Sequence, residues 1–410
     1  MDLIRKYKLF FALLNTGFVG NILVIYYLSK GLTYAQIGTA IAISTIGTFL
    51  FEVPTGVVAD KISRKTSVLI SLTLYPIGTL ILIFLKNFPM LIAYSIITPL
   101  AVAFMSGSLQ AWLYDNLKHL GREKEYRAVM RDVKTITLPL TALTVAIGGI
   151  LAQLYGFTLP LALTLILEIG TLIVALTIPE YEFQKPERSY LSHTLQSFKE
   201  IRRPELLWLI ILTITVVMAT NQFRQFFEPY LGDILAKNLK TTLMGTLGIL
   251  GIIEAIVKVI PKLIGIRLRD SWSIKAYSLA PVIIPVLTAL SVIYQNPLWI
   301  IALGIIVTIV HTAFGFNLGV ELQHRIPSEK RATMMSIYSM VSALAMSGFY
   351  FIYGFVVDWV GLAEARLLFA LILLGAGVLL KAGELLGPLK DVLKLRHMEA
   401  MPNPLKSEKS

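Results

Sequence analysis

The sequence is built from long, nearly uninterrupted runs of apolar residues, separated by short polar stretches. A helix of about 20 residues crosses the hydrocarbon core of a bilayer and satisfies its own backbone hydrogen bonds. Strands of a membrane barrel alternate in polarity and span in about ten residues, so runs of this length exclude a barrel. Apolar residues make up 56% of the 410-residue chain and charged residues 15%. We therefore predict an all-α membrane protein.

Twelve such runs predict twelve transmembrane helices arranged as two six-helix, pseudo-symmetric bundles. We place the helices at residues 9–28, 36–58, 67–85, 90–117, 135–155, 158–178, 206–231, 242–265, 275–293, 297–321, 333–357 and 362–382. A longer polar connection divides them six and six. The predicted units are an N-terminal bundle (1–179), a cytoplasmic linker with an amphipathic surface helix (180–204), a C-terminal bundle (205–386) and a cytoplasmic tail (387–410).

Basic residues gather on one side of this predicted topology. Of 37 Lys and Arg residues, 31 fall on the side that holds both termini, five fall on the opposite side, and Arg224 lies within a span. Short loops rich in Lys and Arg stay in the cytoplasm. We therefore predict a multi-pass protein of the cell (inner) membrane with both termini cytoplasmic. Because the net charge of +12 serves orientation, we expect no nucleic-acid partner.

The two predicted halves resemble each other in layout. An acidic residue near the inner end of the fourth and tenth helices, Asp115 and Glu321, precedes a basic loop in each half. Short basic loops are common on the cytoplasmic side, but the matching six-plus-six arrangement favours an internal duplication. Such repeats are typical of secondary transporters, whose substrate site lies near the midplane between the repeats.

The turn after the second predicted helix carries a patterned motif. It contains Gly56, Asp60, Lys61, Arg64 and Lys65, in the order Gly-Val-Val-Ala-Asp-Lys-Ile-Ser-Arg-Lys. This stretch resembles the signature loop between helices 2 and 3 of the major facilitator superfamily, with Ser63 in a place where the family usually has Gly.

That resemblance implies a fold, a switch and a cavity. The fold is the twelve-helix major facilitator fold, and the motif forms a conformational switch in which a basic residue pairs with Asp115 at the inner end of helix 4. Helices 1, 4, 7 and 10 would line a central cavity. Two other family patterns are missing, the mid-helix-4 Arg and the Gly-Pro before Gly148-Gly149. Their absence weakens an assignment to drug/proton antiport.

Polar residues inside the predicted spans are the candidate substrate ligands, because they are costly to place in a bilayer. Helix 7 carries Asn221, Arg224, Gln225 and Glu228, whose spacing of i, i+3, i+4 and i+7 puts them on one helical face. Alternatively, Arg224 and Glu228 form an ion pair within the helix and have no other role. The remaining candidates are Asn21, Gln110, His311 and Asn317.

Three ionisable side chains are candidate proton carriers, namely Glu52, Glu254 and His311. An imidazole changes charge near neutral pH, and a desolvated carboxyl group can hold a proton near physiological pH. Glu254 could instead be neutralised by Lys258, four residues away, and His311 could simply bond a neighbouring hydroxyl or carbonyl group. Glu52 has no obvious local partner, so it is the preferred proton site.

The motifs of several other protein classes are missing from the sequence. There is no cysteine, no phosphate-binding Gly-rich loop with Lys, and no metal-ligand spacing. We therefore expect neither an enzyme nor a cofactor or metal site. We predict a secondary active transporter of a small organic solute, working by alternating access and coupled to protons, with export of amphipathic compounds favoured. The alternatives are a nutrient uptake symporter and a non-transporting membrane sensor of the same fold. The expected partners of this monomer are a small-molecule substrate, protons and the lipid bilayer.

Overall fold

The computed structural model describes residues 2–181, 204–268, 279–325 and 331–386, and every element in these ranges is a helix. Within them, the side chains of some residues are not described, among them Asn21, Asp60, Lys258 and Asn317. The predicted amphipathic helix of the linker and the predicted tail lie outside the described residues.

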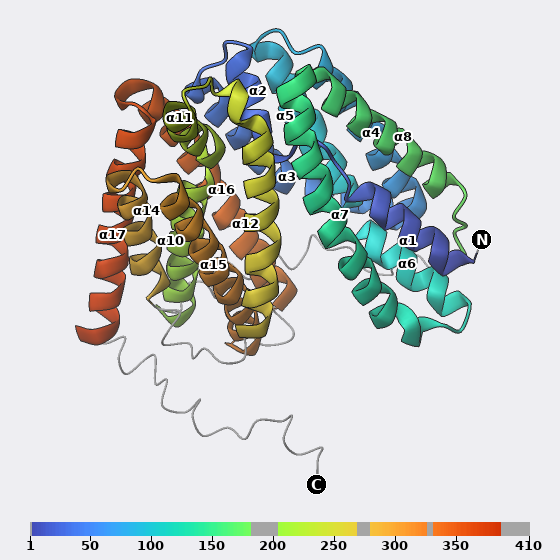
Figure 1. Cartoon of the computed structure of the whole chain (residues 1–410). Helices are drawn as coiled ribbons and strands as arrows, with labels where there is room; N and C mark the ends of the chain where they lie inside the picture. Colours follow the sequence, from blue (N-terminus) through green and yellow to red (C-terminus); the bar gives the residue numbers. More distant parts are fainter. Residues whose placement is uncertain (1, 182–203, 269–278, 326–330, 387–410) are drawn as a thin grey trace.

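The helices of the N-terminal half pack together on the right of Figure 1. They are α1 (Leu3–Leu14), η1 (Gly20–Ile22), α2 (Leu23–Ser29), α3 (Tyr34–Lys61), α4 (Arg64–Ile83), α5 (Phe88–Met105), α6 (Ser108–His119), η2 (Glu123–Glu125), α7 (Tyr126–Tyr155) and α8 (Thr158–Leu176). Side-chain caps set the starts of three of them, because Thr33, Ser63 and Asn87 each accept a hydrogen bond from a backbone N–H in the first turn.

The helices of the C-terminal half pack together on the left of Figure 1. They are α10 (Pro204–Arg224), α11 (Phe227–Leu239), η5 (Met244–Thr246), α12 (Leu247–Leu268), α14 (Ala280–Ile293), α15 (Pro297–Arg325), α16 (Arg331–Val360) and α17 (Leu362–Leu386).

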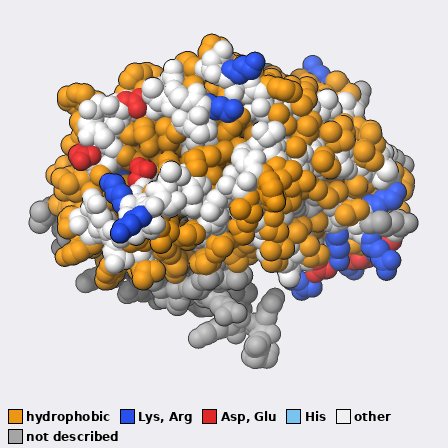
Figure 2. All heavy atoms as spheres, turned by 45° about the horizontal axis from the view of Figure 1, so that its top comes forward, with side chains coloured by type: hydrophobic (Ala, Val, Ile, Leu, Met, Phe, Trp, Pro, Cys, Tyr) orange, Lys and Arg blue, Asp and Glu red, His pale blue; other side chains and the backbone are white. Residues whose placement is uncertain are grey.

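Several of the described helical segments are long and apolar enough to cross a membrane. Eight meet this criterion alone, and a ninth span is possible if a pair of helices bent by 93°, Ile210–Leu239 and Met244–Val257, counts as one. Each of the twelve spans predicted from the sequence overlaps a described helix. The difference in number arises because some predicted spans are broken or only partly described, such as α14 with 14 residues. Figure 2 shows hydrophobic side chains over most of the visible face, with charged side chains in small groups.

Three predicted spans are broken in the structure, which corrects the expectation of continuous helices at 9–28, 90–117 and 206–231. The first breaks between Leu14 and Gly20, the fourth at Ser106 and Gly107, and the seventh at Gln225 and Phe226. Gly20, Gly107 and Phe226 all have positive φ, at 47°, 72° and 57°. Broken helices leave backbone groups unpaired at membrane depth, and they are tolerated where protein or a cavity surrounds them.

The two halves meet along two helix pairs, α3 with α16 and α7 with α12. At both crossings glycine lets the backbones touch. A Cβ atom on Gly38 would lie 2.5 Å from the carbonyl oxygen of Tyr350, and one on Gly149 would lie 2.9 Å from the Cα atom of Gly251. Small residues at such positions allow membrane helices to pack closely.

These contacts between the halves are concentrated at one end of the molecule. The other end, which we call the basic end, carries Lys61, Arg64, Lys118, Arg122 and Arg131. Hydrogen bonds join the halves at Tyr34 and Ala35 with Asp358, at Ala42 with Ser347, and at Gln153 with Gly248. All lie in the parts of their helices remote from the basic end, and α7 and α12 diverge toward the bottom of Figure 1. The halves are therefore joined at the end opposite the basic end.

Candidate functional site

A cavity lies at the break in the seventh predicted span. It is small in this arrangement of the helices, and residues from α10, α11, α12 and α15 line it. The lining combines charged, aromatic and small side chains: Phe223, Arg224, Phe227, Glu228, Glu254, Val257, Gly304 and Thr308. Three candidate residues from the sequence, Arg224, Glu228 and Glu254, therefore meet at one site. The cavity can offer both signs of charge beside two aromatic rings.

The break brings Arg224 and Glu228 to the cavity by a route that the sequence did not predict. Residue 226 has left-handed backbone geometry, so α10 ends at Arg224 and a new helix begins at Phe227. The predicted single face through positions 221, 224, 225 and 228 is therefore wrong, because spacing by i+7 applies only within one continuous helix. The alternative prediction, an ion pair between Arg224 and Glu228 within one helix, is affected in the same way, because the two residues lie on different helices.

Arg366 holds this break in place. The side chain is fully buried, and its Nη2 and Nη1 atoms donate to the carbonyl oxygens of Phe223 (3.0 Å) and Gln225 (3.3 Å). The guanidinium group also lies over the rings of Phe223 and Tyr230. A cation is favourable at a helix C-terminus, where carbonyl groups lack partners in the helix. The topology count placed Arg366 among the charges of the outer side, whereas the structure buries it in α17.

Glu254 joins the cavity to the other half of the molecule. Its carboxylate oxygens lie about 3 Å from the position a Cβ atom would take on Gly20 (2.8 and 3.0 Å), so only glycine fits there without a shift. Gly20 belongs to the break in the first predicted span. A side chain of α12 thus contacts η1 of the N-terminal half, so the cavity, whose lining residues all belong to the C-terminal half, borders the interface between the halves.

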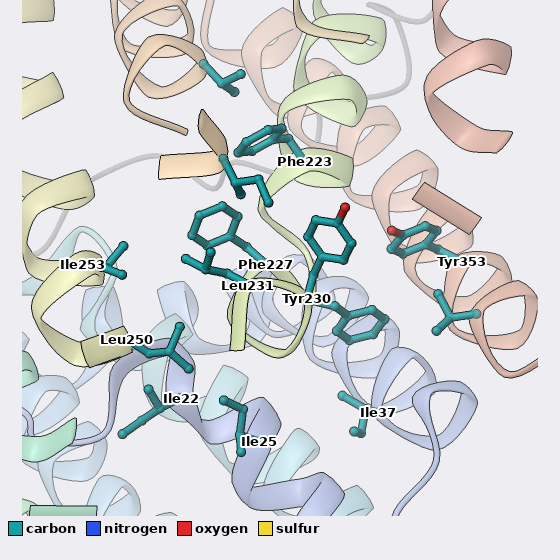
Figure 3. Close-up of a cluster of buried hydrophobic side chains, with 14 of the residues drawn as sticks. Ile22, Ile25, Ile37, Phe223, Phe227, Tyr230, Leu231, Leu250, Ile253 and Tyr353 are labelled. Carbon is teal, nitrogen blue, oxygen red and sulfur yellow. The ribbon is translucent and has the colours of Figure 1, made fainter. Parts of the chain in front are cut away.

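A hydrophobic cluster closes the space between the halves on the side remote from the basic end. Figure 3 shows Ile22, Ile25 and Ile37 of the N-terminal half facing Phe227, Leu231, Leu250 and Ile253 of the C-terminal half. The ring of Phe226 stacks on Tyr353, with centroids 5.7 Å apart, and meets Tyr34 edge to face at 4.8 Å. These contacts close the interface between the halves at the end opposite the basic end.

The remaining substrate candidates have mixed surroundings. His311 is partly buried on α15, its Nδ1 atom has no hydrogen-bond partner among the described residues, and the charge of Arg224 acts on it. Asn221 donates to the carbonyl oxygen of Val217 (2.8 Å), a bond within its own helix. Gln225 receives the bond from Arg366 at its backbone carbonyl group, and Gln110 is exposed on α6. Asn21 and Asn317 fall among the undescribed side chains.

Glu52 does not have the surroundings that its predicted role requires. It is exposed on α3, so the protein itself does not desolvate its carboxyl group. Glu254, by contrast, is 4% exposed. Of the two carboxylates proposed as proton carriers, Glu254 therefore lies in the more enclosed place.

The motif between α3 and α4 holds together the basic end of the N-terminal half. Arg64 forms an ion pair with Asp115, the partner that the family resemblance implied. Lys65 donates through Nζ to the carbonyl oxygen of Ile178 (2.7 Å), and Lys61 is exposed. Nothing lies within 4 Å of a Cβ position on Gly56, and the side chain of Asp60 is not described. The switching role of this group stays a prediction.

Ser63 serves the turn well in place of the family's usual Gly. Its backbone is extended, with φ at −174° and ψ at 153°, which any residue adopts. Its Oγ atom accepts a hydrogen bond from the backbone N–H of Thr66 at 2.9 Å, and so caps α4.

The fold and cavity define a class of protein, a helical membrane protein of two halves with a charged cavity beside the interface between them. The family model described as "Major Facilitator Superfamily" matches residues 9–350. The chain therefore belongs to this superfamily.

Two curated relatives carry the same family name. The chain is 23% identical over 228 residues to the "Uncharacterized MFS-type transporter YxaM" of Bacillus subtilis (strain 168), covering 54% of this chain and 56% of that protein. It is 27% identical over 154 residues to the "Uncharacterized MFS-type transporter MJ1560" of Methanocaldococcus jannaschii, covering 37% and 38%. The chain thus spans about half the length, or less, of the curated relatives it matches.

Solved structures resemble the whole chain in fold. The nucleoside transporter NupG superposes with a TM-score of 0.76 at 16% identity, covering 93% of this chain and 99% of that one. A D-xylose-proton symporter gives a TM-score of 0.57 at 15% identity, covering 90% and 95%. At this identity the similarity shows the fold alone.

Proposed function

We propose that this chain is a secondary active transporter that moves a small organic solute by alternating access. The observation that supports it most is the cavity at the break of α10 and α11, which is bounded by Glu254 and its contact to Gly20 in the other half. A solute bound there touches residues whose positions depend on how the halves meet. Solute binding can thereby bias which end of the molecule is open.

The lining favours an amphipathic solute with a cationic or hydrogen-bonding group. Glu228 and Glu254 supply two carboxylates against the single guanidinium group of Arg224, and Phe223 and Phe227 supply apolar faces that also attract cations. We propose export of such compounds as the direction of transport. Uptake of a polar nutrient is the alternative.

Proton coupling is proposed to act through Glu254. Its carboxylate lies against Gly20, so adding a proton would remove a charge from a contact between the halves. Changing the charge of a buried group changes the stability of the arrangement that contains it. His311, beside Arg224, is the second candidate. At the basic end, the pair of Arg64 and Asp115 is proposed to act as the conformational switch that the family motif implies.

Flux measurements in proteoliposomes test the proposal. The purified protein is reconstituted, a pH gradient is imposed, and movement of ethidium, a lipophilic aromatic cation, is recorded. We expect transport toward the acidic compartment, as an exporter exchanging its solute for protons requires. Proton-driven uptake of uridine in place of ethidium would indicate the nutrient symporter. No flux of either probe from correctly inserted protein would favour the non-transporting sensor.

Two variants test the roles proposed for Glu254 and Arg224. Glu254→Gln is expected to abolish gradient-driven accumulation but only to weaken exchange of labelled for unlabelled ethidium, because Glu228 still lines the cavity. Arg224→Ala is expected to change the rate of both, since Arg224 lines the cavity. Arg127→Met, an exposed substitution at the basic end, is the matched control and should behave as wild type. Gradient-driven transport by Glu254→Gln equal to that of wild type would remove Glu254 from the coupling.

A further inference from the structure

A second cavity lies inside the N-terminal half, apart from the site just described. Its empty volume is about 960 Å³, and it lies between α1, α4 and α8. Its lining shares no residue with the cavity at Arg224: Leu13, Leu14, Asn15, Thr16, Gly17, Leu72, Tyr75, Met105, Thr164, Glu168 and Thr171. No role for a carboxylate at position 168, in an apolar helix, is evident from the sequence.

Glu168 is the one charged residue among those that line this cavity. Its Oε1 atom accepts a hydrogen bond from Thr79 Oγ1 at 2.9 Å. Its Oε2 atom is buried and has no hydrogen-bond partner among the described residues. A buried carboxylate oxygen is costly to leave unpaired, so this atom calls for a bound ion or proton.

The threonine side chains of the lining present lone pairs rather than protons, while the phenol of Tyr75 can donate or accept. The hydroxyl groups of Thr16, Thr164 and Thr171 each donate to a carbonyl group of their own helix, at 2.6, 2.9 and 2.7 Å. Asn15 likewise directs its Nδ2 atom to the carbonyl oxygen of Phe11 at 2.8 Å. The threonine and asparagine oxygens that remain available to a ligand are acceptors. An acceptor-rich lining with one carboxylate selects a cation.

The end of α1 adds to this preference. α1 ends at Leu14, and its last turn borders the cavity. The C-terminal end of a helix carries partial negative charge, and broken membrane helices use such ends to bind Na⁺ or H⁺. The titratable groups whose charges interact with Glu168 are the phenols of Tyr75 on α4 and Tyr94 on α5. α1 contributes no ionisable side chain to the lining.

We propose that this cavity is a monovalent-cation site, occupied by Na⁺ or a proton, with the carboxylate of Glu168 as its charged ligand. The site is linked to the central cavity through the break in the first span. Asn15 to Gly17 line the cation site, Phe18 donates its backbone N–H to Thr164 Oγ1 (3.1 Å), and Gly20 touches the carboxylate of Glu254. A cation at Glu168 can therefore act on the segment that contacts the C-terminal half.

Binding measurements on purified full-length protein in detergent test the site without any assumption about the transported solute. Thermal unfolding is followed while NaCl replaces choline chloride at constant ionic strength, at several pH values. We expect Na⁺ to raise the unfolding midpoint of wild type, and to do so more strongly as the pH rises, because protons compete for the same carboxylate. Glu168→Gln should weaken the apparent Na⁺ affinity by about ten-fold or more.

A second pair of variants separates binding from folding. Thr171→Val removes an acceptor from the lining and should weaken the Na⁺ response. Thr73→Val removes a comparable hydroxyl group, bonded to the carbonyl oxygen of Leu69, from the exposed face of α4, and should leave the response unchanged. If Na⁺ has no effect but wild type takes up one proton more than Glu168→Gln across the same pH range, the cation is a proton. Equal Na⁺ responses and equal proton uptake in wild type and Glu168→Gln would overturn the proposal.

Discussion

At the scale of single residues, the sequence does not reveal which charged side chains are buried at the break between α10 and α11. Arg366 counts as an outer-loop charge by position, yet it is fully buried and ends α10. Its partners are backbone carbonyl groups of a helix more than 140 positions away, and residue types carry no information about such partners. Arg64 and Asp115 could be paired from the sequence, because a family motif names both.

The role of Arg366 predicts a large loss of stability when it is removed. Arg366→Met should leave the carbonyl oxygens of Phe223 and Gln225 buried without a partner, at a cost of about 2–4 kcal/mol. The measurement is the midpoint of thermal unfolding in detergent. Arg127→Met, which changes an exposed Arg, should shift stability by no more than about 0.5 kcal/mol. Equal midpoints for the two variants would refute the role of Arg366.

At the scale of elements, helix positions follow from hydropathy but helix breaks do not. Apolar runs predict where a helix can lie in a bilayer, and each predicted span overlaps a described helix. At the break, Phe226 adopts left-handed backbone geometry although it is not Gly. The predicted span 206–231 has no Pro before position 229, so no residue type marks the break in the sequence. The stabilising contacts come from Arg366 and the aromatic cluster around Tyr353, so tertiary structure overrides local preference there.

One inter-bundle contact at this scale predicts a shift between conformations. Asp358 of α16 accepts hydrogen bonds from the backbone N–H groups of Tyr34 (3.0 Å) and Ala35 (2.7 Å), and so caps α3 from the other half. Loss of a cap costs about 0.5–2 kcal/mol. Asp358→Ala should therefore raise the population in which this end is open by up to about thirty-fold.

The chain contains no cysteine, so spin labels can be placed without removing native thiols. Labels on Lys30→Cys and Trp359→Cys, both exposed at the end opposite the basic end, report the separation of the halves by double electron–electron resonance. Asp358→Ala should add a population at longer distance. Glu364→Ala, an exposed acidic residue at the same end, is the control and should leave the distribution unchanged. An unaltered distribution in Asp358→Ala would show that this cap does not hold the halves together.

At the scale of the whole molecule, two halves are joined at the end opposite the basic end, and the cavity at Arg224 borders the interface between them. The two-bundle layout follows from twelve apolar runs and a central polar connection. The conformation of the molecule cannot be predicted from these runs. Alternative arrangements of the halves use the same helices and differ only in which helix faces touch. In the structure, the backbones of the two halves approach closely at Gly38, Gly149, Gly251 and Gly354.

The most direct test is the side from which the central cavity can be reached. Val257 lines it, and Trp359, which is 83% exposed, marks the opposite end. In sealed membrane vesicles, Val257→Cys should react with a membrane-impermeant thiol reagent from the cytoplasmic side, and Trp359→Cys from the outer side. Adding Asp358→Ala should increase labelling of Val257→Cys from outside. Labelling of Val257→Cys from the outer side alone would contradict both the predicted orientation and the closure seen in the structure.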